Sequence, residues 1–146
     1  MFMRCDHQIW CDLFAGSGAI GLEALSRGAN KVVFVEKDGE AFKVLRANIE
    51  KCNIQLHAVC IHDEVQRVLQ RQEKWIFDVI YIDPPYDLPL EPLVASLVGH
   101  PWVGEHTLLV FERRATENLE WLQTQFHILK QRKVGQSQYV IGRVKI

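Results

Sequence analysis

The sequence lacks any apolar run that reaches the ~18 residues needed for a membrane-spanning helix. It also lacks the charged, apolar and small-residue regions of a signal peptide. Its four cysteines form no C-x-x-C pair, and their spacing fits neither a zinc site nor a secreted disulfide framework. We therefore expect a soluble cytoplasmic protein without a metal, whose cysteines are reduced and mostly buried.

Net charge is also nearly absent, −1 at pH 7, which argues against indiscriminate binding to nucleic acid. The charge is unevenly distributed, because residues 111–146 hold seven basic and three acidic residues, which leaves −5 for residues 1–110. A phosphate-binding patch and a solvated outer strand face both fit this pattern. No repeat, low-complexity tract or linker interrupts the 146 residues, so we expect one domain, residues 1–146.

Three glycines near the start of the chain separate an apolar stretch from an amphipathic one. Gly16, Gly18 and Gly21 have G-x-G-x-x-G spacing, which predicts a tight strand-to-helix turn that a ligand can approach closely. The next apolar run ends at Glu36, whose carboxylate would meet the hydroxyls of a ribose. NAD and S-adenosylmethionine fit this arrangement equally well, although only NAD would place a pyrophosphate at the helix N-terminus.

The rest of the chain alternates between strand and helix patterns, which predicts an α/β fold. Strands are expected at 8–14, 31–35, 55–61, 75–82 and 107–112, with a terminal hairpin of 126–134 and 137–144. Helices are expected after the glycine turn, from Asp38, around 65–69 and at 90–98, with a helical turn at 118–122. The buried face of the second helix is predicted to comprise Ala41, Val44, Leu45, Asn48 and Cys52.

Polar residues follow the third predicted strand directly. Asp63 and Glu64 should therefore reach the same carboxyl edge of a parallel sheet as the glycine turn and Glu36. Asp63 is a candidate acceptor for the amino group of an adenine ring. This adds a third contact to the predicted cofactor site.

A long apolar strand pattern, residues 75–82, ends abruptly at Asp83-Pro84-Pro85-Tyr86. The exocyclic amine of a nucleobase is a poor nucleophile, because its lone pair is delocalised into the ring. Asp83 and the Pro84 carbonyl can accept both N–H groups from a frame that the prolines stiffen, and Tyr86 can stack on the base. Transfer of a methyl group from a sulfonium requires positioning and an electric field rather than a metal or covalent nucleophile.

These motifs resemble the bacterial small-subunit ribosomal RNA guanine-N2 methyltransferases of the RsmD type, and the likeness covers nearly the whole chain. It rests on residues 12–29, 35–38, 83–86 and 133–136. The resemblance implies a Rossmann-like class I methyltransferase fold, with a mostly parallel, twisted seven-stranded sheet, a C-terminal antiparallel hairpin and helices on both faces. It also implies S-adenosyl-L-methionine as cofactor and a guanine of 16S RNA as acceptor, in naked RNA or in a small-subunit assembly intermediate, with no membrane or obligate protein partner.

The resemblance implies a catalytic set of Asp83, Pro84, Pro85 and Tyr86. The expected cofactor contacts are Asp12, Phe14, Gly16, Ser17, Gly18, Gly21, Glu36, Lys37, Asp63 and Glu64. Family members also have an arm before the first strand, with an Arg-Pro-Thr element and an Arg-Glu pair, whereas this sequence starts at Met1 almost on that strand. We therefore expect the chain as given to bind the cofactor but to methylate RNA slowly or not at all.

Three other functions share part of this pattern. An NAD-dependent dehydrogenase would use the glycine turn and Glu36 but would leave residues 83–86 without a task. Amino-methyltransferases that act on another RNA or on adenine-N6 of DNA share the chemistry of residues 83–86. A nucleic-acid-binding domain could keep the methyltransferase fold and have lost turnover.

Overall fold

The computed structural model describes residues 4–71 and 73–146. The chain divides into two compact units, Met1–Gln72 and Glu73–Ile146, which are described in turn. Among the described residues, no helix is both long and apolar enough to cross a membrane.

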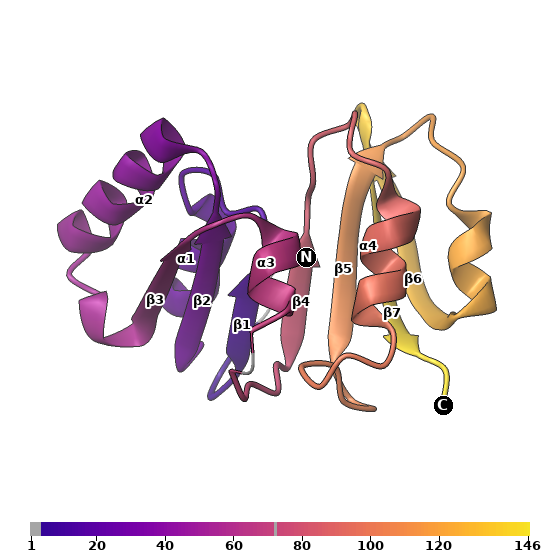
Figure 1. The fold of residues 1–146 in the computed structure, drawn as a ribbon, viewed down its shortest axis with the longest axis horizontal. Coiled ribbons are helices and arrows are strands. Elements are labelled where there is room, and N and C mark those ends of the chain that lie inside the picture. The colour runs from indigo at the N-terminus through magenta and orange to yellow at the C-terminus, as the bar shows by residue number, and fades with distance from the viewer. Residues whose placement is uncertain (1–3, 72) are drawn as a thin grey trace. The chain divides into compact units, whose positions relative to one another are not determined.

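The first unit is built on parallel strands in the order β3-β2-β1 (Figure 1). They are β1, Ile9–Asp12; β2, Lys31–Glu36; and β3, Ala58–His62. The central β2 pairs with β1 through Cys11 and Val33, and with β3 through Glu36 and His62. Because the strands are parallel, the segments after β1, β2 and β3 all leave from the same edge of this sheet.

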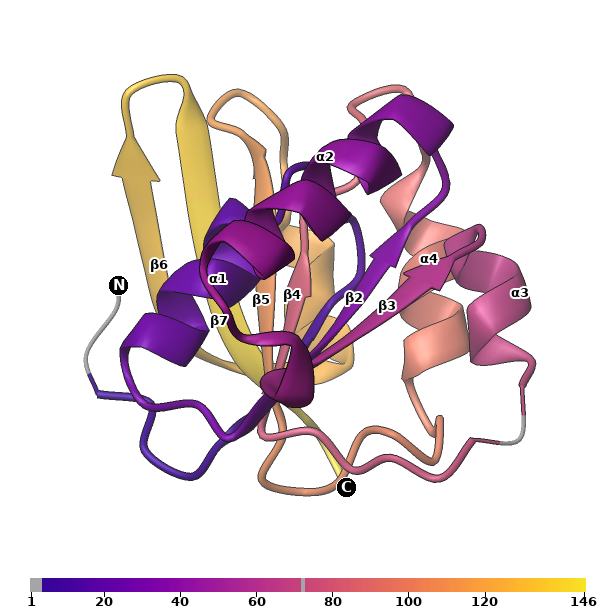
Figure 2. The same cartoon turned by 90° about the vertical axis from the view of Figure 1, so that its left-hand side faces the viewer.

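Helices cover both faces of this sheet (Figure 2). Helices α1, Ala19–Ser26, and α2, Gly39–Lys51, lie on one face, and α3, Val65–Leu69, lies on the other. The Asp38 carboxylate caps α2 by accepting a hydrogen bond from the Ala41 N–H at 2.9 Å. Gly28 ends α1 with a φ of 104°, as expected for a residue just after a helix.

The buried face of α2 differs from the prediction. Val44 is 49% exposed and Cys52 is also exposed, whereas Leu45 and Ile49 are buried. The face that packs on the sheet is centred on the i, i+4 pair Leu45 and Ile49, so the apolar Val44 lies off its edge. The cysteines are free, and of the four only Cys5 and Cys11 are buried.

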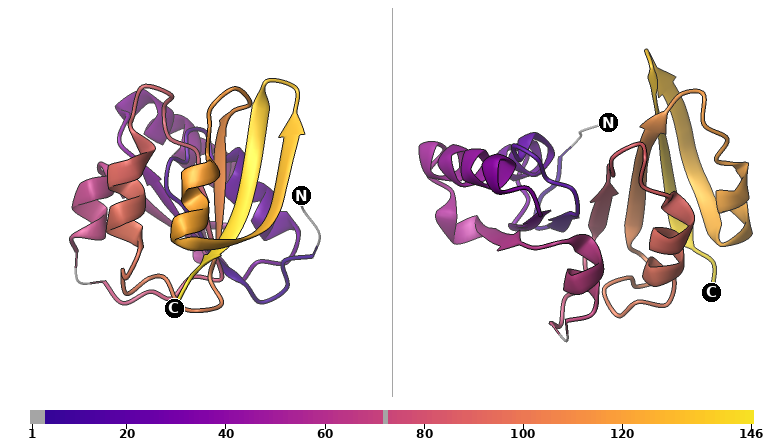
Figure 3. Two further views of the ribbon diagram at one scale, coloured as in Figure 1. Left: turned by 90° about the vertical axis from the view of Figure 1, so that its right-hand side faces the viewer. Right: turned by 45° about the horizontal axis from the view of Figure 1, so that its top comes forward.

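The second unit contains a mixed sheet in the order β4-β5-β7-β6. Its strands are β4, Val79–Ile82; β5, Leu108–Arg114; β6, Phe126–Val134; and β7, Ser137–Val144. β4 and β5 are parallel, whereas β7 is antiparallel to both β5 and β6, which confirms the predicted terminal hairpin. Helix α4, Leu90–Leu97, and the 3-10 helix η2, Glu120–Thr124, lie on the same face of this sheet (Figure 3).

Three predicted strands are shorter than expected. The first, expected at 8–14, spans only Ile9–Asp12. Residues Gln55–His57 form a 3-10 helix, η1, so the third strand starts at Ala58. The fourth strand starts at Val79 rather than at Trp75. Trp75 stacks on Phe77 with ring centroids 5.7 Å apart, and the Phe77 N–H donates to the Trp102 carbonyl at 3.2 Å. Trp75 and Phe77 therefore contribute aromatic packing rather than strand pairs, and Ile76 between them is exposed.

Candidate functional site

The glycine turn lies in the first unit, between β1 and α1. Gly16 and Gly18 have φ values of 56° and 90°, a left-handed conformation that strains other residues. A Cβ on Gly18 would lie 2.5 Å from the Leu45 side chain, whereas a Cβ on Gly16 would meet nothing within 4 Å. Gly18 is thus favoured by its positive φ and by its packing against Leu45, and Gly16 leaves its backbone open to a ligand.

Gly21 and the segment around the turn are held by neighbouring elements. A Cβ on Gly21 would come within 2.3 Å of the Phe34 ring, so this glycine allows α1 to pack closely on β2. The Asn48 side-chain amide donates to the Ser17 carbonyl at 2.9 Å. Asp12 is buried, Phe14 is half-buried and Ser17 is exposed. The turn is therefore held in place by its contacts with β2 and α2.

Glu36 links the end of β2 to the glycine turn. Its Oε1 accepts the Gly16 N–H and its Oε2 accepts the Asp38 N–H, both at 2.8 Å. An ionised carboxylate has about four lone-pair sites, so each oxygen keeps acceptor capacity for a further donor. The two backbone bonds fix the orientation of the carboxylate, which can then accept hydrogen bonds from a vicinal diol.

Asp63 follows β3, and its backbone N–H donates to the Glu36 carbonyl at 3.2 Å. Its side chain accepts from the Glu64 N–H and from Arg71 Nη2, each at 2.8 Å. The Glu64 hydrogen bond and the Arg71 contact hold the pKa of Asp63 below its usual range. Asp63 is thus ionised and already bound to a cation, so a ligand amine would have to share it.

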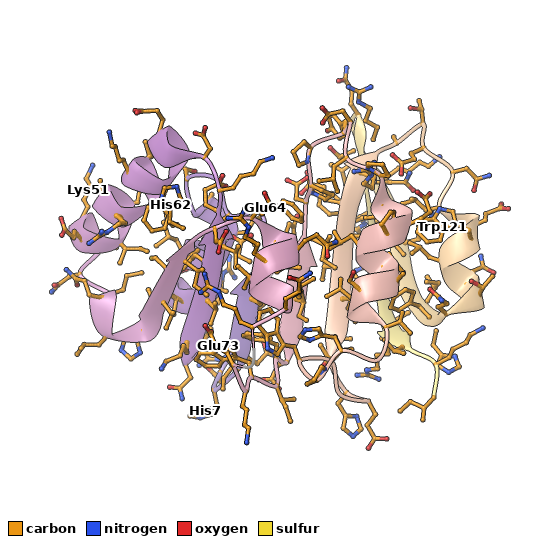
Figure 4. All side chains as sticks on the ribbon, viewed as in Figure 1. His7, Lys51, His62, Glu64, Glu73 and Trp121 are labelled. Atoms are coloured by element: carbon orange, nitrogen blue, oxygen red, sulfur yellow. The ribbon has the colours of Figure 1, made fainter. Side chains whose placement is uncertain are left out.

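Lys37 and Glu64 lie at the same edge of the first unit. Both side chains are exposed, and the Lys37 carbonyl lies 3.1 Å from His62 Nε2. Figure 4 labels His62, the last residue of β3, and Glu64, the residue before α3, which flank Asp63. The first unit therefore gathers the predicted cofactor residues at the carboxyl ends of its strands.

The tetrapeptide Asp83-Pro84-Pro85-Tyr86 follows β4 in the second unit. All residues of β4 are buried, and Asp83 is half-buried at its end. Burial raises the pKa of the Asp83 carboxyl to about 6; the Glu112 charge adds to this effect and Arg113 opposes it. A carboxylate that burial has partly stripped of water is stabilised by a ligand N–H that donates a hydrogen bond to it.

Glu112 organises a small cluster that the sequence did not indicate. Tyr81 Oη donates to Glu112 Oε1 at 2.5 Å, and Tyr139 pairs with Glu112 across β5 and β7. Burial raises the pKa of Tyr139, and the charges of Glu112, Asp83 and Tyr86 raise it further. The alternation of side chains along β5 predicts which face Glu112 lies on. Its contacts with Tyr81 and Tyr139 depend on strand pairing, which the sequence pattern does not give.

Arg113 of β5 contacts the tetrapeptide from the face of the sheet opposite to Glu112. Its side chain is 4% exposed and contacts Glu117 through Nε at 3.0 Å and Nη2 at 2.9 Å. The guanidinium also donates to the Pro85 carbonyl at 3.4 Å and to the Tyr86 and Leu88 carbonyls at 3.5 Å. Several long, charge-assisted bonds from one fork thus restrain this turn.

Tyr86 presents an open aromatic surface at the end of this turn. It is 47% exposed, and the Arg114 guanidinium carbon lies 4.2 Å from its ring centroid. Such a cation–π contact fixes the ring without burying it completely. The second unit thus combines a poised carboxylate, a proline-stiffened turn and an aromatic platform.

The fold defines the class of the protein. A Streptococcus pyogenes protein superposes with a TM-score of 0.87 at 26% identity, over 96% of this chain and 88% of that one. A Haemophilus influenzae protein assigned to the methylases superposes with a TM-score of 0.83 at 28% identity, over 97% and 89%. The chain has the fold of the class I methyltransferases, and the predicted fold class is confirmed.

The family follows from the sequence comparison. The family model described as "Conserved hypothetical protein 95" matches residues 2–143, and the chain belongs to this family. "Ribosomal RNA small subunit methyltransferase D" of H. influenzae is 36% identical over 110 residues, 73% of this chain and 57% of that protein. "Putative rRNA methyltransferase YlbH" of Bacillus subtilis is 34% identical over 104 residues, 69% and 56%. The expected family resemblance is confirmed, and the chain spans just over half the length of these relatives.

Proposed function

We propose that this chain binds S-adenosylmethionine with its first unit and transfers the methyl group to the N2 amine of a guanine in small-subunit ribosomal RNA. Asp83 carries the proposal, because its pKa of about 6 and its place before two prolines suit an acceptor for an amine. The relatives named as rRNA methyltransferases support the choice of RNA as substrate.

The first unit fits S-adenosylmethionine by its donor and acceptor set. The open backbone at Gly16 admits the amino-acid end of the cofactor, and Glu36 keeps acceptor capacity for both ribose hydroxyls. Residues 11–26 contain no lysine or arginine to neutralise a pyrophosphate, which favours this cofactor over NAD. When bound, S-adenosylmethionine supplies a methyl group on a sulfonium, an electrophile that needs no metal.

The second unit prepares the acceptor. Asp83 and the Pro84 carbonyl accept the two N–H groups of the amine, which directs the nitrogen lone pair towards the methyl carbon. The N–C bond forms as the S–C bond breaks, so positive charge develops on nitrogen and strengthens its hydrogen bond to Asp83. One amine proton then passes to the Asp83 carboxylate, which already accepts its hydrogen bond, and the products are N2-methylguanine and S-adenosylhomocysteine. Tyr86 stacks on the base and keeps it in line.

Methyl-labelled S-adenosylmethionine, incubated with 16S RNA or with partly assembled small subunits, tests this proposal when the labelled base is mapped. Even if transfer by the chain as given is slow, we expect the transferred label to lie on guanine N2. An Asp83→Ala variant should lose about 2.7–4 kcal/mol of transition-state stabilisation. Its cofactor affinity, measured by calorimetry, should stay within twofold of the parent. Label on an adenine or in DNA would reassign the substrate, and RNA binding without any label would favour a binding domain. Tighter binding of NAD than of S-adenosylmethionine would refute the cofactor.

A further inference from the structure

The terminal hairpin carries the most one-sided charge in the chain. Residues 126–146 contain five of the 17 basic residues and none of the 18 acidic ones. The other 125 residues therefore have a net charge of −6. A charge segregated in this way on one hairpin favours a polyanionic partner over non-specific solvation.

Strand pairing places part of this charge in one row with the Glu112 cluster. Arg132 of β6 pairs with Tyr139 of β7, and Tyr139 pairs with Glu112 of β5, so the three side chains share a face. Lys130 pairs with Ile141 and lies on the same face, because it is two residues from Arg132 along β6. Lys130 and Arg132 are exposed, and neither forms an ion pair within residues 4–71 and 73–146.

The same face leads to the tetrapeptide. Arg114 is two residues beyond Glu112 on β5, so its side chain points to the same side, where it covers the Tyr86 ring at 4.2 Å. The hairpin turn also lies beside the end of β5, because the Ala115 N–H donates to the Gln136 carbonyl at 2.8 Å. Cations and aromatic rings thus continue from Tyr86 onto the hairpin within the second unit.

We propose that this face of the hairpin, the hairpin track (Arg114, Lys130, Arg132 and Tyr139), binds the backbone of single-stranded RNA next to the base held by Tyr86. The track combines cations that can contact phosphates with half-buried or exposed aromatic rings that can stack on bases. Proteins that bind single-stranded nucleic acid have this composition. Glu112 is the cross-strand neighbour of Tyr139 in this row, and its carboxylate already accepts a hydrogen bond from the Tyr81 hydroxyl. This inference rests on the proposed function, because it assigns the route by which that substrate reaches Asp83.

Binding of a fluorescently labelled single-stranded RNA oligonucleotide, titrated with KCl and without cofactor, tests the track. A Lys130→Gln/Arg132→Gln variant should bind roughly tenfold more weakly, and its slope of log K against log salt should fall by about 1.4. The matched control Lys43→Gln/Arg46→Gln removes the same two charge types from the exposed side of α2 and should change binding less than twofold. Lys133→Gln, whose side chain lies on the opposite face with Gln138, should also have little effect.

Each other outcome has a defined meaning. Equal weakening by the track variant and the α2 control would overturn the inference, as would an effect of Lys133→Gln as large as that of the pair. The inference would also be overturned if poly-glutamate displaced the labelled RNA as effectively as unlabelled RNA does. If RNA binding follows the track but the parent protein labels no ribosomal RNA, the proposed function fails while the track stands. If labelling occurs and the track variant binds normally, only the track fails.

Discussion

Two carboxylates at strand ends, Glu36 and Asp83, have opposite surroundings. Glu36 accepts two backbone N–H groups, which hold it in place before any ligand arrives. Asp83 loses water to burial and faces the charge of Glu112, so its pKa rises to about 6. The fixed orientation of Glu36 suits hydrogen bonding to a ribose diol. The partly desolvated carboxylate of Asp83 suits an acceptor that is stabilised when an amine donates to it.

A Glu36→Ala variant should bind S-adenosylmethionine more weakly by about 1.5–3 kcal/mol, because charge-assisted hydrogen bonds to the ribose are lost. Isothermal calorimetry measures the effect directly. Glu40→Ala is the matched control, since this carboxylate is 87% exposed on the first turn of α2 and contacts Lys43 of the same helix. Equal affinity of the parent and Glu36→Ala would remove Glu36 from the cofactor site.

The raised pKa of Asp83 predicts a pH dependence of activity. Because the carboxylate is the acceptor, kcat/KM should rise about tenfold per pH unit below pH ~6 and level off above it. Asp83→Asn should lower the rate and abolish this inflection. A profile of the parent that stays flat from pH 5 to pH 8 would contradict the assignment.

The same shift has a consequence for stability. The folded protein holds the Asp83 proton up to about pH 6, whereas the unfolded chain releases it near 3.8. Between these values the folded state binds more protons, so the contribution of Asp83 to the free energy of unfolding falls as pH rises and is constant above pH ~6. Urea titrations across this window should therefore show a parent that loses stability relative to Asp83→Asn as pH increases.

At the scale of the element, β5 supplies restraints to both sides of the tetrapeptide. Its alternation sends Glu112 and Arg114 to one face and Arg113 to the other. Arg113 reaches the carbonyls of the turn, and Arg114 fixes the Tyr86 ring. Gln138 of β7 also donates to the Arg114 and Glu117 carbonyls at 2.8 and 2.7 Å, which ties down the segment that carries the Arg113 partner.

Replacement of Arg113 by lysine should therefore slow methyl transfer without weakening the cofactor. Lysine keeps the charge but cannot make the forked contact with Glu117 and the three carbonyls at once. We expect single-turnover rates to fall about 10- to 100-fold, as a misplaced reacting group would cause. Affinity for S-adenosylmethionine should be unchanged. Arg46→Lys, at an exposed position of α2, is the control. An Arg113→Lys enzyme with the parent rate would show that the turn holds its shape without Arg113.

The elements differ in how much of them could be predicted from sequence. The glycine turn, Glu36 and the terminal hairpin follow from local signals: spaced glycines, a strand-ending carboxylate and a glycine between two apolar runs. The role of Arg113 and the Glu112 cluster did not follow, because each depends on which strands are neighbours. Strand length was also misjudged where aromatic packing replaced pairing, as at Trp75 and Phe77. The site residues themselves remain predictions.

At the scale of the whole molecule, the proposed chemistry is divided between the two units. The predicted cofactor residues all belong to Met1–Gln72, and the predicted catalytic residues all belong to Glu73–Ile146. Each unit has just over 70 residues, a size at which one hydrophobic core rarely supplies more than about 3–5 kcal/mol. The prediction of one domain over residues 1–146 can therefore be tested by asking whether the units unfold together.

We expect a single cooperative unfolding transition for the whole chain, because a core of the size that either unit holds gives only marginal stability on its own. Tryptophan reports on each unit separately: Trp10, 5% exposed, lies in the first, and Trp102, fully buried, lies in the second. A variant that keeps only Trp10 and one that keeps only Trp102, with phenylalanine elsewhere, should show coincident urea midpoints, matched by far-ultraviolet circular dichroism. S-adenosylmethionine at a hundred times its Kd should stabilise both reporters equally, by about 2.7 kcal/mol, although its proposed contacts are confined to the first unit. A cofactor that shifted the Trp10 transition and left the Trp102 transition in place would show that the units unfold independently and that the chain is not one domain.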